Sequence, residues 1–191
     1  GTWRRLGSSH ADRIAREGVK FNNARCTTPL CSPSRASYLT GLYAHSHRVV
    51  NNDRNGQAEL SHRLPTFSRI LFNAGYETAF VGKWHMGFDD TVRPGFDSWV
   101  SFKAVGLYQN STLNVNGVRE QKRGYTTDFL NEHAVNFIQQ PHDKPFLMYV
   151  GHKAPHLPYL PAPRYETLYK DATYQPPAIA PGDLEGKPVL S

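Results

Sequence analysis

The sequence contains little cysteine and no long apolar run. Only two of its 191 residues are cysteines, Cys26 and Cys31, which excludes a disulfide-stapled scaffold and a cysteine-based zinc cluster. No stretch of about 18 apolar residues occurs, so we expect no membrane span. Residues 1–18 are basic and polar and lack the apolar core of a signal peptide. Long lysine or arginine runs and nucleic-acid-binding motifs are missing too, so we expect no nucleic-acid partner.

The composition is that of a folded protein with a mildly basic surface. Hydrophobic residues make up 39 % of the chain, which is enough for a sizeable core. The net charge of +6 is compatible with an anionic partner such as nucleic acid, an anionic glycan or a phosphate, but on charge alone a solvated basic surface is the favoured explanation.

Helical and strand patterns alternate along the chain. This alternation predicts an α/β fold with a mixed, mostly parallel sheet flanked by helices. The apolar run at 146–150 is typical of a buried parallel strand. Residues 89–124 read as turns and short strands, around 114–117 among others, and the chain reads as irregular from 155 to 191. We expect helices at 8–17, 33–40, 65–74 and 127–140, and strands at 19–25, 76–81 and 146–150.

Cys31 lies close to the start of the helix expected at 33–40. The first turn of a helix offers free N–H groups and a positive dipole end, both of which attract an anion. Arg35 lies four residues on, and a neighbouring arginine lowers the pKa of a cysteine and makes it reactive. The residues alone therefore leave two interpretations open: a reactive cysteine at an anion site, or a small buried residue beside a capped helix. A disulfide between Cys26 and Cys31 would remove the reactive thiol.

Two segments carry a resemblance to the sulfatase family. Residues 29–41 resemble the first sulfatase signature, whose core is Cys-x-Pro-x-Arg, with Tyr38 where an apolar residue is usual. Residues 75–85 resemble the second signature, which ends in Gly-Lys-x-His. The two occur in the order and at the spacing of the family.

The resemblance implies that Cys31 is oxidised to formylglycine by a formylglycine-generating enzyme. One hydroxyl of the hydrated aldehyde attacks sulfur and the alcohol leaves; the second is deprotonated, and sulfate is eliminated with the aldehyde restored. Arg35 is implied as a catalytic residue of the anion site, Lys83 as the ligand of the sulfate oxygens and the nucleophile, and His85 as the base. Since Cys31, Lys83 and His156 all follow expected strands, we expect them to converge at one edge of the sheet.

Histidines supply the other candidate site residues. His156 lies in a Pro-His-x-Pro turn like that of sulfatases, as leaving-group acid or sulfate ligand, or else as an ordinary turn histidine. His152 and Lys153 are candidates to line the same pocket.

A further group of candidates follows the first signature. The pattern at 43–52 resembles N-acetylglucosamine-6-sulfatases, which implies a sulfated carbohydrate substrate and substrate-binding roles for His45, His47 and Asn52. No third ligand stands at metal spacing from the two histidines, so we interpret them as loop residues near the substrate rather than a metal site.

The resemblance also implies one Ca²⁺ ion, bound by carboxylate and amide oxygens and by the modified Cys31. The family's aspartate pair precedes the first position of this sequence, and Asp89–Asp90 comes too late for it, so we interpret that pair as loop. We therefore expect residues 1–191 to be part of one catalytic domain, an incomplete one that is inactive or poorly folded by itself. The family location is extracytoplasmic.

Two other functions stay open. The superfamily also contains phosphonate and phosphate ester hydrolases, some with the same formylglycine. A degenerate, non-catalytic glycan-binding protein is the third hypothesis. The joint presence of Cys31, Arg35, Lys83 and His85 argues against it.

Overall fold

The computed structural model describes residues 10–52 and 57–173, which divide into two compact units. Unit 1 comprises Gly1–Ala24 and Pro163–Ser191, and unit 2 comprises Arg25–Ala162. The described elements of unit 1 are helix α1 (His10–Glu17) and the 3₁₀ helix η2 (Pro163–Tyr165), and neither contains a buried residue.

The expectations for the first part of the chain are met only in part. The helix predicted at 8–17 is confirmed from His10 onward, and its first two residues lie outside the described part. Its apolar residue Ile14 is exposed. The strand predicted at 19–25 is wrong: the segment is turns and irregular chain. Strand-forming Val19 and Phe21 are exposed there, because no described strand pairs with them.

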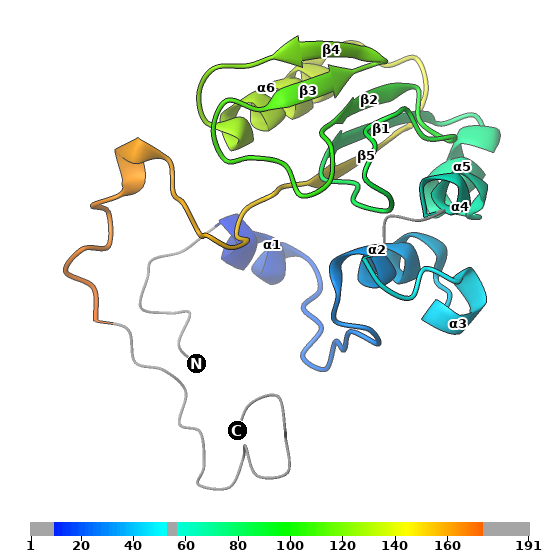
Figure 1. Ribbon diagram of the computed structural model, residues 1–191, viewed down its shortest axis with the longest axis horizontal. Helices are drawn as coiled ribbons and strands as arrows, with labels where there is room; N and C mark the ends of the chain where they lie inside the picture. The colour runs from blue at the N-terminus through cyan, green and yellow to red at the C-terminus, as the bar shows by residue number, and fades with distance from the viewer. Residues whose placement is uncertain (1–9, 53–56, 174–191) are drawn as a thin grey trace, which may run out of the picture. The chain divides into compact units, whose positions relative to one another are not determined.

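Unit 2 is built on a five-stranded sheet with the order β4-β3-β2-β1-β5 (Figure 1). β1 pairs in parallel with β2 and β5, whereas β3 is antiparallel to both β2 and β4. The predicted mixed sheet with helices around it is therefore confirmed. The strands are β1 (Glu77–Gly82), β2 (Ser98–Ser101), β3 (Thr112–Val115), β4 (Val118–Gln121) and β5 (Phe146–Gly151).

Alternating residues of β1 supply the two cores. Phe80 stacks on Trp99 with ring centroids 4.6 Å apart and belongs to the cluster that includes Ala36 and Leu39 of α2 (Cys31–Thr40). Val81 points to the other face and packs in the cluster that contains Leu130 of α6 (Thr126–Gln139). The period of two along a strand therefore places α2 on one face and α6 on the other.

The long periodic helices agree with their sequence patterns. α2 begins two residues earlier than expected and ends at Gly41, whose φ of 69° is the left-handed C-cap that glycine favours. α5 (Phe67–Asn73) and α6 confirm the other two helices, and the apolar residue Ile70 of α5 is exposed. Two short helices, α3 (Ala44–His47) and α4 (Gln57–Arg63), have no counterpart among the predicted elements.

β5 confirms the strand at 146–150 but not its burial. The strand lies at an edge of the sheet, next to β1, so most of its residues are only half-buried. β1, which has β2 on one side and β5 on the other, is the buried strand.

Candidate active site

Cys31 is the first residue of α2, at the positive end of the helix dipole. Leu30 precedes it in extended conformation and offers no side-chain cap. The cap comes instead from a distant loop, because the Ser32 N–H donates to Oδ1 of Asn52 at 2.9 Å. Both cysteines are free, so the disulfide alternative is wrong.

The end of β1 brings the second signature to Cys31. The Lys83 N–H donates to the carbonyl oxygen of Gly151 at 2.6 Å, which holds the ends of β1 and β5 together. Lys83 Nζ lies 3.6 Å from Cys31 Sγ, and Arg35 Nη1 donates to the Lys83 carbonyl oxygen. The structure thus brings Lys83 and Arg35 to Cys31, although Cys31 lies at the start of α2 and not at the end of a strand as expected.

Two glycines permit this approach. Gly82 and Gly151 are paired across β1 and β5. A Cβ on Gly82, whose φ is +125°, would lie 2.0 Å from the Gly151 carbonyl oxygen. Only glycine fits at that position, which explains the Gly-Lys pair physically.

His85 follows in a buried turn with φ 52°. Its carbonyl oxygen accepts a hydrogen bond from Ser32 Oγ, which ties the turn to the first turn of α2. Burial, followed by the positive charges of Lys83 and Arg35, lowers the pKa of the His85 ring to about 4. Nδ1 is buried without a hydrogen-bond partner among the described residues. A neutral imidazole of this kind can accept a proton.

The loop after β5 supplies three more candidates. Lys153 is buried, and its ammonium donates to the Val105 carbonyl oxygen at 3.3 Å. Burial lowers the pKa of Lys153 and that of the half-buried His152. His156 and Lys153 both lie within electrostatic range of His85, since their charges lower its pKa. Lys83 and Arg35 therefore lie beside Cys31, and His85 and His156 lie within electrostatic range of each other.

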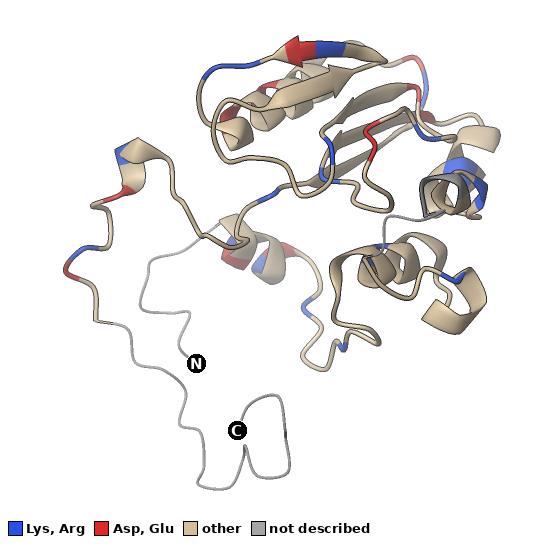
Figure 2. Ribbon diagram, viewed as in Figure 1, with Lys and Arg blue, Asp and Glu red and all other residues tan. Residues whose placement is uncertain are grey.

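The site is electropositive. Burial lowers the pKa of the Lys83 ammonium, while the neighbouring Cys31 opposes that effect. Burial likewise lowers the pKa of the Arg35 guanidinium. Cys31, Arg35 and Lys83 line an open pocket of about 430 Å³, together with Tyr38 and Tyr149. Figure 2 shows blue segments on the loops below the sheet, on the side where α2 lies.

The described residues do not fit a calcium ion. Ca²⁺ needs several oxygen ligands, and the groups beside Cys31 are an ammonium, a guanidinium and an imidazole. No group of three His, Cys, Asp or Glu residues that could hold a metal occurs in the described part of the chain. Cys31 therefore remains only a predicted ligand of Ca²⁺.

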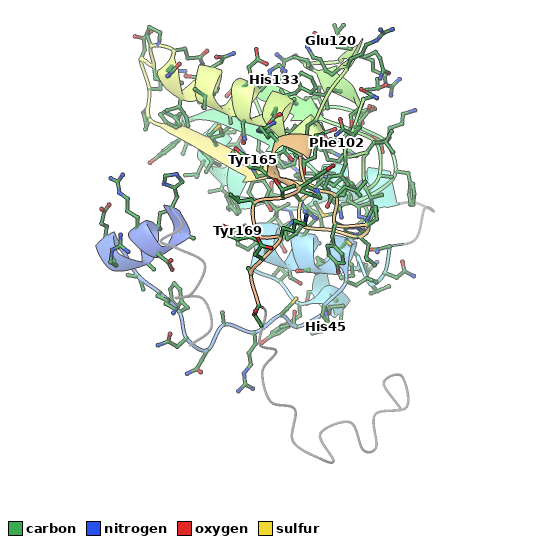
Figure 3. The ribbon with its side chains drawn as sticks, turned by 90° about the vertical axis from the view of Figure 1, so that its left-hand side faces the viewer. His45, Phe102, Glu120, His133, Tyr165 and Tyr169 are labelled. Carbon is green, nitrogen blue, oxygen red and sulfur yellow. The ribbon has the colours of Figure 1, made fainter. Side chains whose placement is uncertain are left out.

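The candidates at 43–52 have mainly scaffold contacts. His47 is buried: its Nδ1 accepts from the Val49 N–H at 3.1 Å, so Nε2 carries the proton and lies 2.9 Å from Ser37 Oγ of α2. Burial lowers the pKa of His47. His45, within α3, is exposed and stacks on Tyr43 with ring centroids 5.8 Å apart; Figure 3 labels it. These contacts tie His47 to α2 and leave His45 accessible.

The acidic pair Asp89–Asp90 is loop, as predicted. Both carboxylates are paired with arginines: Asp89 with Arg93 at 2.9 Å and Asp90 with Arg119 at 2.5 Å. Hydrogen bonds from Arg93 and Thr91 hold the pKa of Asp89 at about 2, against the opposing effect of burial. These carboxylates therefore hold the loop together.

Sequence reasoning missed two residues that organise the site. The Ser32 hydroxyl joins the two signatures, and the Tyr108 hydroxyl contacts the backbone of His156. Ser32 lies inside the first signature, but it occupies one of the variable positions of the core Cys-x-Pro-x-Arg, so the resemblance does not single it out. Tyr108 lies in the stretch interpreted as turns, where no pattern singles it out.

Comparison with known proteins agrees with this geometry. The model of the Sulfatase family matches residues 3–179. The N-acetylglucosamine-6-O-sulfatase of Bacteroides thetaiotaomicron is 35 % identical over 188 residues, covering 95 % of this chain and 32 % of the relative. An extracellular sulfatase of Drosophila melanogaster, the SULF-1 homolog, is 32 % identical over 175 residues, covering 84 % of this chain and 16 % of that protein. The chain thus spans a third or less of these curated relatives.

A solved structure extends the likeness to three dimensions. It is a complex of a protein with its substrate D-glucosamine-2-N,6-O-disulfate, matched with a TM-score of 0.74 and 34 % identity. The match covers 88 % of this chain and 33 % of the other. Within the described residues, no helix has both the length and the apolar character needed to cross a membrane.

Proposed function

The chain belongs to the sulfatase family, and on that basis we propose that the protein hydrolyses sulfate esters of glycans with a formylglycine made from Cys31. One observation carries the proposal. Cys31 Sγ lies at the positive end of α2 and 3.6 Å from Lys83 Nζ, in an open pocket that Arg35 also lines. A nucleophile beside two fixed cations and a helix N-terminus suits a tetrahedral anion that reacts at its central atom.

The proposed substrate is a 6-sulfated N-acetylglucosamine unit. The relative from Bacteroides thetaiotaomicron is named for that activity, and the similar solved structure holds a glucosamine carrying 6-O-sulfate. The segment at 43–52, with the exposed His45, supports the same class. We propose that His152 and Lys153 line the sugar side of the pocket, whereas His47 and Asn52 act through α2.

The chain's own residues have the chemistry for two proton transfers. Lys83 and Arg35 neutralise the sulfate oxygens as charge develops on them. His85, neutral because its pKa is about 4, takes a proton from the nucleophile's second hydroxyl. His156 gives a proton to the sugar oxygen when the bond between sulfur and that oxygen breaks. The formylglycine supplies the hydroxyl that attacks and the route by which sulfate is expelled.

Two further partners belong to the proposal. A formylglycine-generating enzyme must oxidise Cys31, and a Ca²⁺ ion is the cofactor that sulfatases generally use. The resemblance to an extracellular sulfatase supports an extracytoplasmic location.

The decisive test is the chemical state of Cys31. The protein is expressed from its complete gene with a formylglycine-generating enzyme, and the peptide that contains Cys31 is analysed by mass spectrometry. We expect the aldehyde, together with turnover of 6-sulfated N-acetylglucosamine. Cys31→Ala should lower kcat/KM by about a thousandfold or more, because the covalent route is lost.

The exposed Cys26 provides the matched control. It lies outside the pocket, so Cys26→Ser should leave turnover nearly unchanged. Faster turnover of aryl phosphates than of sulfate esters would instead support a phosphate or phosphonate hydrolase. An unmodified Cys31 and no turnover of either would leave the non-catalytic reading.

A further inference from the structure

Tyr108 is a buried tyrosine whose hydroxyl bonds twice to one residue of the active-site loop. The hydroxyl donates to the His156 carbonyl oxygen at 2.6 Å and accepts from the His156 N–H at 2.9 Å. A single side chain thus satisfies both backbone groups of the proposed leaving-group acid. The side chain is 5 % exposed, so neither bond competes freely with water.

The loop has few other hydrogen bonds available. Pro155 and Pro158 flank His156 and have no N–H to donate. The other backbone bond at this residue is the one that the Tyr159 N–H donates to the His156 carbonyl, at 2.8 Å. The position of the His156 backbone therefore depends strongly on Tyr108.

The ring of His156 is fixed as well. Its Nδ1 lies 2.8 Å from the Leu157 carbonyl oxygen, which can only accept, so Nδ1 carries a proton. Nε2 is then the nitrogen left to exchange a proton with a substrate. The loop backbone determines the direction in which Nε2 points. The two hydrogen bonds from Tyr108 to that backbone therefore help to orient Nε2.

Tyr108 is itself held by contacts with the start of helix α6 and with neighbouring side chains. Its carbonyl oxygen accepts from the N–H of Thr126, the first residue of α6, at 2.8 Å. Its ring stacks with Tyr125, centroids 6.1 Å apart, and the Lys153 ammonium lies 4.8 Å from the Tyr108 ring centroid. One side chain therefore contacts two candidates of the site, His156 through its hydroxyl and Lys153 through its ring.

We propose that Tyr108 is the positioning residue that aims His156 at the leaving oxygen of the substrate. The inference rests on the proposed sulfatase function and adds to it a residue outside both signatures. The inference predicts that loss of Tyr108 affects substrates according to whether their leaving group needs a proton. A sugar alkoxide needs a proton as it leaves, whereas a nitrophenolate is stable as an anion and does not.

The experiment compares Tyr108→Phe with wild type on two substrates, in the protein expressed from its complete gene and carrying formylglycine. Phenylalanine keeps the ring under Lys153 and removes both bonds to His156. We expect kcat/KM for 6-sulfated N-acetylglucosamine to fall by about 10- to 100-fold, and that for 4-nitrophenyl sulfate to fall by less than about threefold. The ratio of the two values is insensitive to how much protein is folded.

Tyr125→Phe is the matched control, because Tyr125 stacks on Tyr108 while its hydroxyl donates to Leu160, not to His156. It should leave the ratio unchanged. An equal fall on both substrates in Tyr108→Phe, or no fall, would overturn the inference while leaving the proposed function intact. Absence of sulfatase turnover in the wild type would overturn the proposed function itself.

Discussion

Gly82 shows, at the scale of a residue, why the second signature has the form Gly-Lys. The parallel ends of β1 and β5 meet there, and the Lys83 N–H donates to Gly151 at 2.6 Å. Any side chain at position 82 would collide with the backbone that Lys83 binds. A motif recognised by resemblance thus has a steric cause.

Gly82→Ala should therefore disrupt both stability and activity. The new Cβ would lie 2.0 Å from the Gly151 oxygen, so β1 and β5 must separate. We expect a loss of about 3 kcal/mol or more in the free energy of unfolding, measured by urea denaturation, because overpacking adds to backbone strain. Lys83 would move away from Cys31, so turnover should fall as well.

Gly117→Ala isolates the strain. Gly117 has φ +95°, but a Cβ added there would meet no other atom within 4 Å. Its substitution should cost only about 1 kcal/mol, the cost of placing a side chain at positive φ. Equal losses in the two variants would refute the steric argument at Gly82.

Between elements, His142 joins the end of α6 to the start of β1. Its ring lies 2.7 Å from Glu77 of β1 and 2.8 Å from the carbonyl oxygen of Phe137 in α6. Gln140 bonds to the same glutamate at 3.1 Å. These contacts fix α6 against the strand that ends at the active site.

This junction makes stability depend on pH. The hydrogen bond to Glu77 raises the pKa of His142 above its usual value, so the folded protein holds this proton more tightly than the unfolded chain. The stabilisation is fully present below the unfolded pKa, near 6.5, and is lost as pH rises through the folded pKa. His142→Asn should therefore destabilise the protein more at pH 6 than above the raised pKa, where only the ring contacts with Phe137 and Phe146 are lost.

The measurement is the thermal unfolding temperature between pH 6 and 9. His10→Asn, at an exposed position of α1, is the control and should follow the wild type throughout. A His142→Asn deficit that stays constant across this range would contradict a contribution from the proton.

For the molecule as a whole, resemblance and periodicity predicted the centre of the site and the main elements. Apolar periods identified α5 and α6 because each helix packs on a core, and apolar runs identified β1 and β5 because both strands contact the two cores. The parallel strands β1 and β5 end side by side, which explains why Lys83 and the His152–His156 loop begin at one sheet edge. Cys31 reaches Lys83 from the first turn of α2, not from a strand end.

Other features depend on distant partners that no local pattern encodes. Asn52 caps α2 from 20 residues away, and the Tyr108 hydroxyl reaches His156 across 48 positions. The edge position of β5 follows from strand order, which its apolar sequence does not reveal. The segment 19–25 has strand propensity but no described partner strand, so propensity alone was misleading.

The charge distribution of unit 2 leads to the last prediction. The charges of Arg35 and Lys153 both act on Lys83, and none of the three forms an ion pair with a carboxylate within the described ranges. Burying cations without counter-charges destabilises the fold, so an anion bound among them should stabilise it. Sulfate should therefore raise the unfolding temperature by a few degrees more than chloride at the same ionic strength, corresponding to about 2.7 kcal/mol at 100 times its Kd. Lys83→Gln should abolish most of this difference, whereas Lys20→Gln, at an exposed position, should preserve it. Equal shifts with sulfate and chloride would mean that the salts only screen surface charge, and that the pocket holds no specific anion.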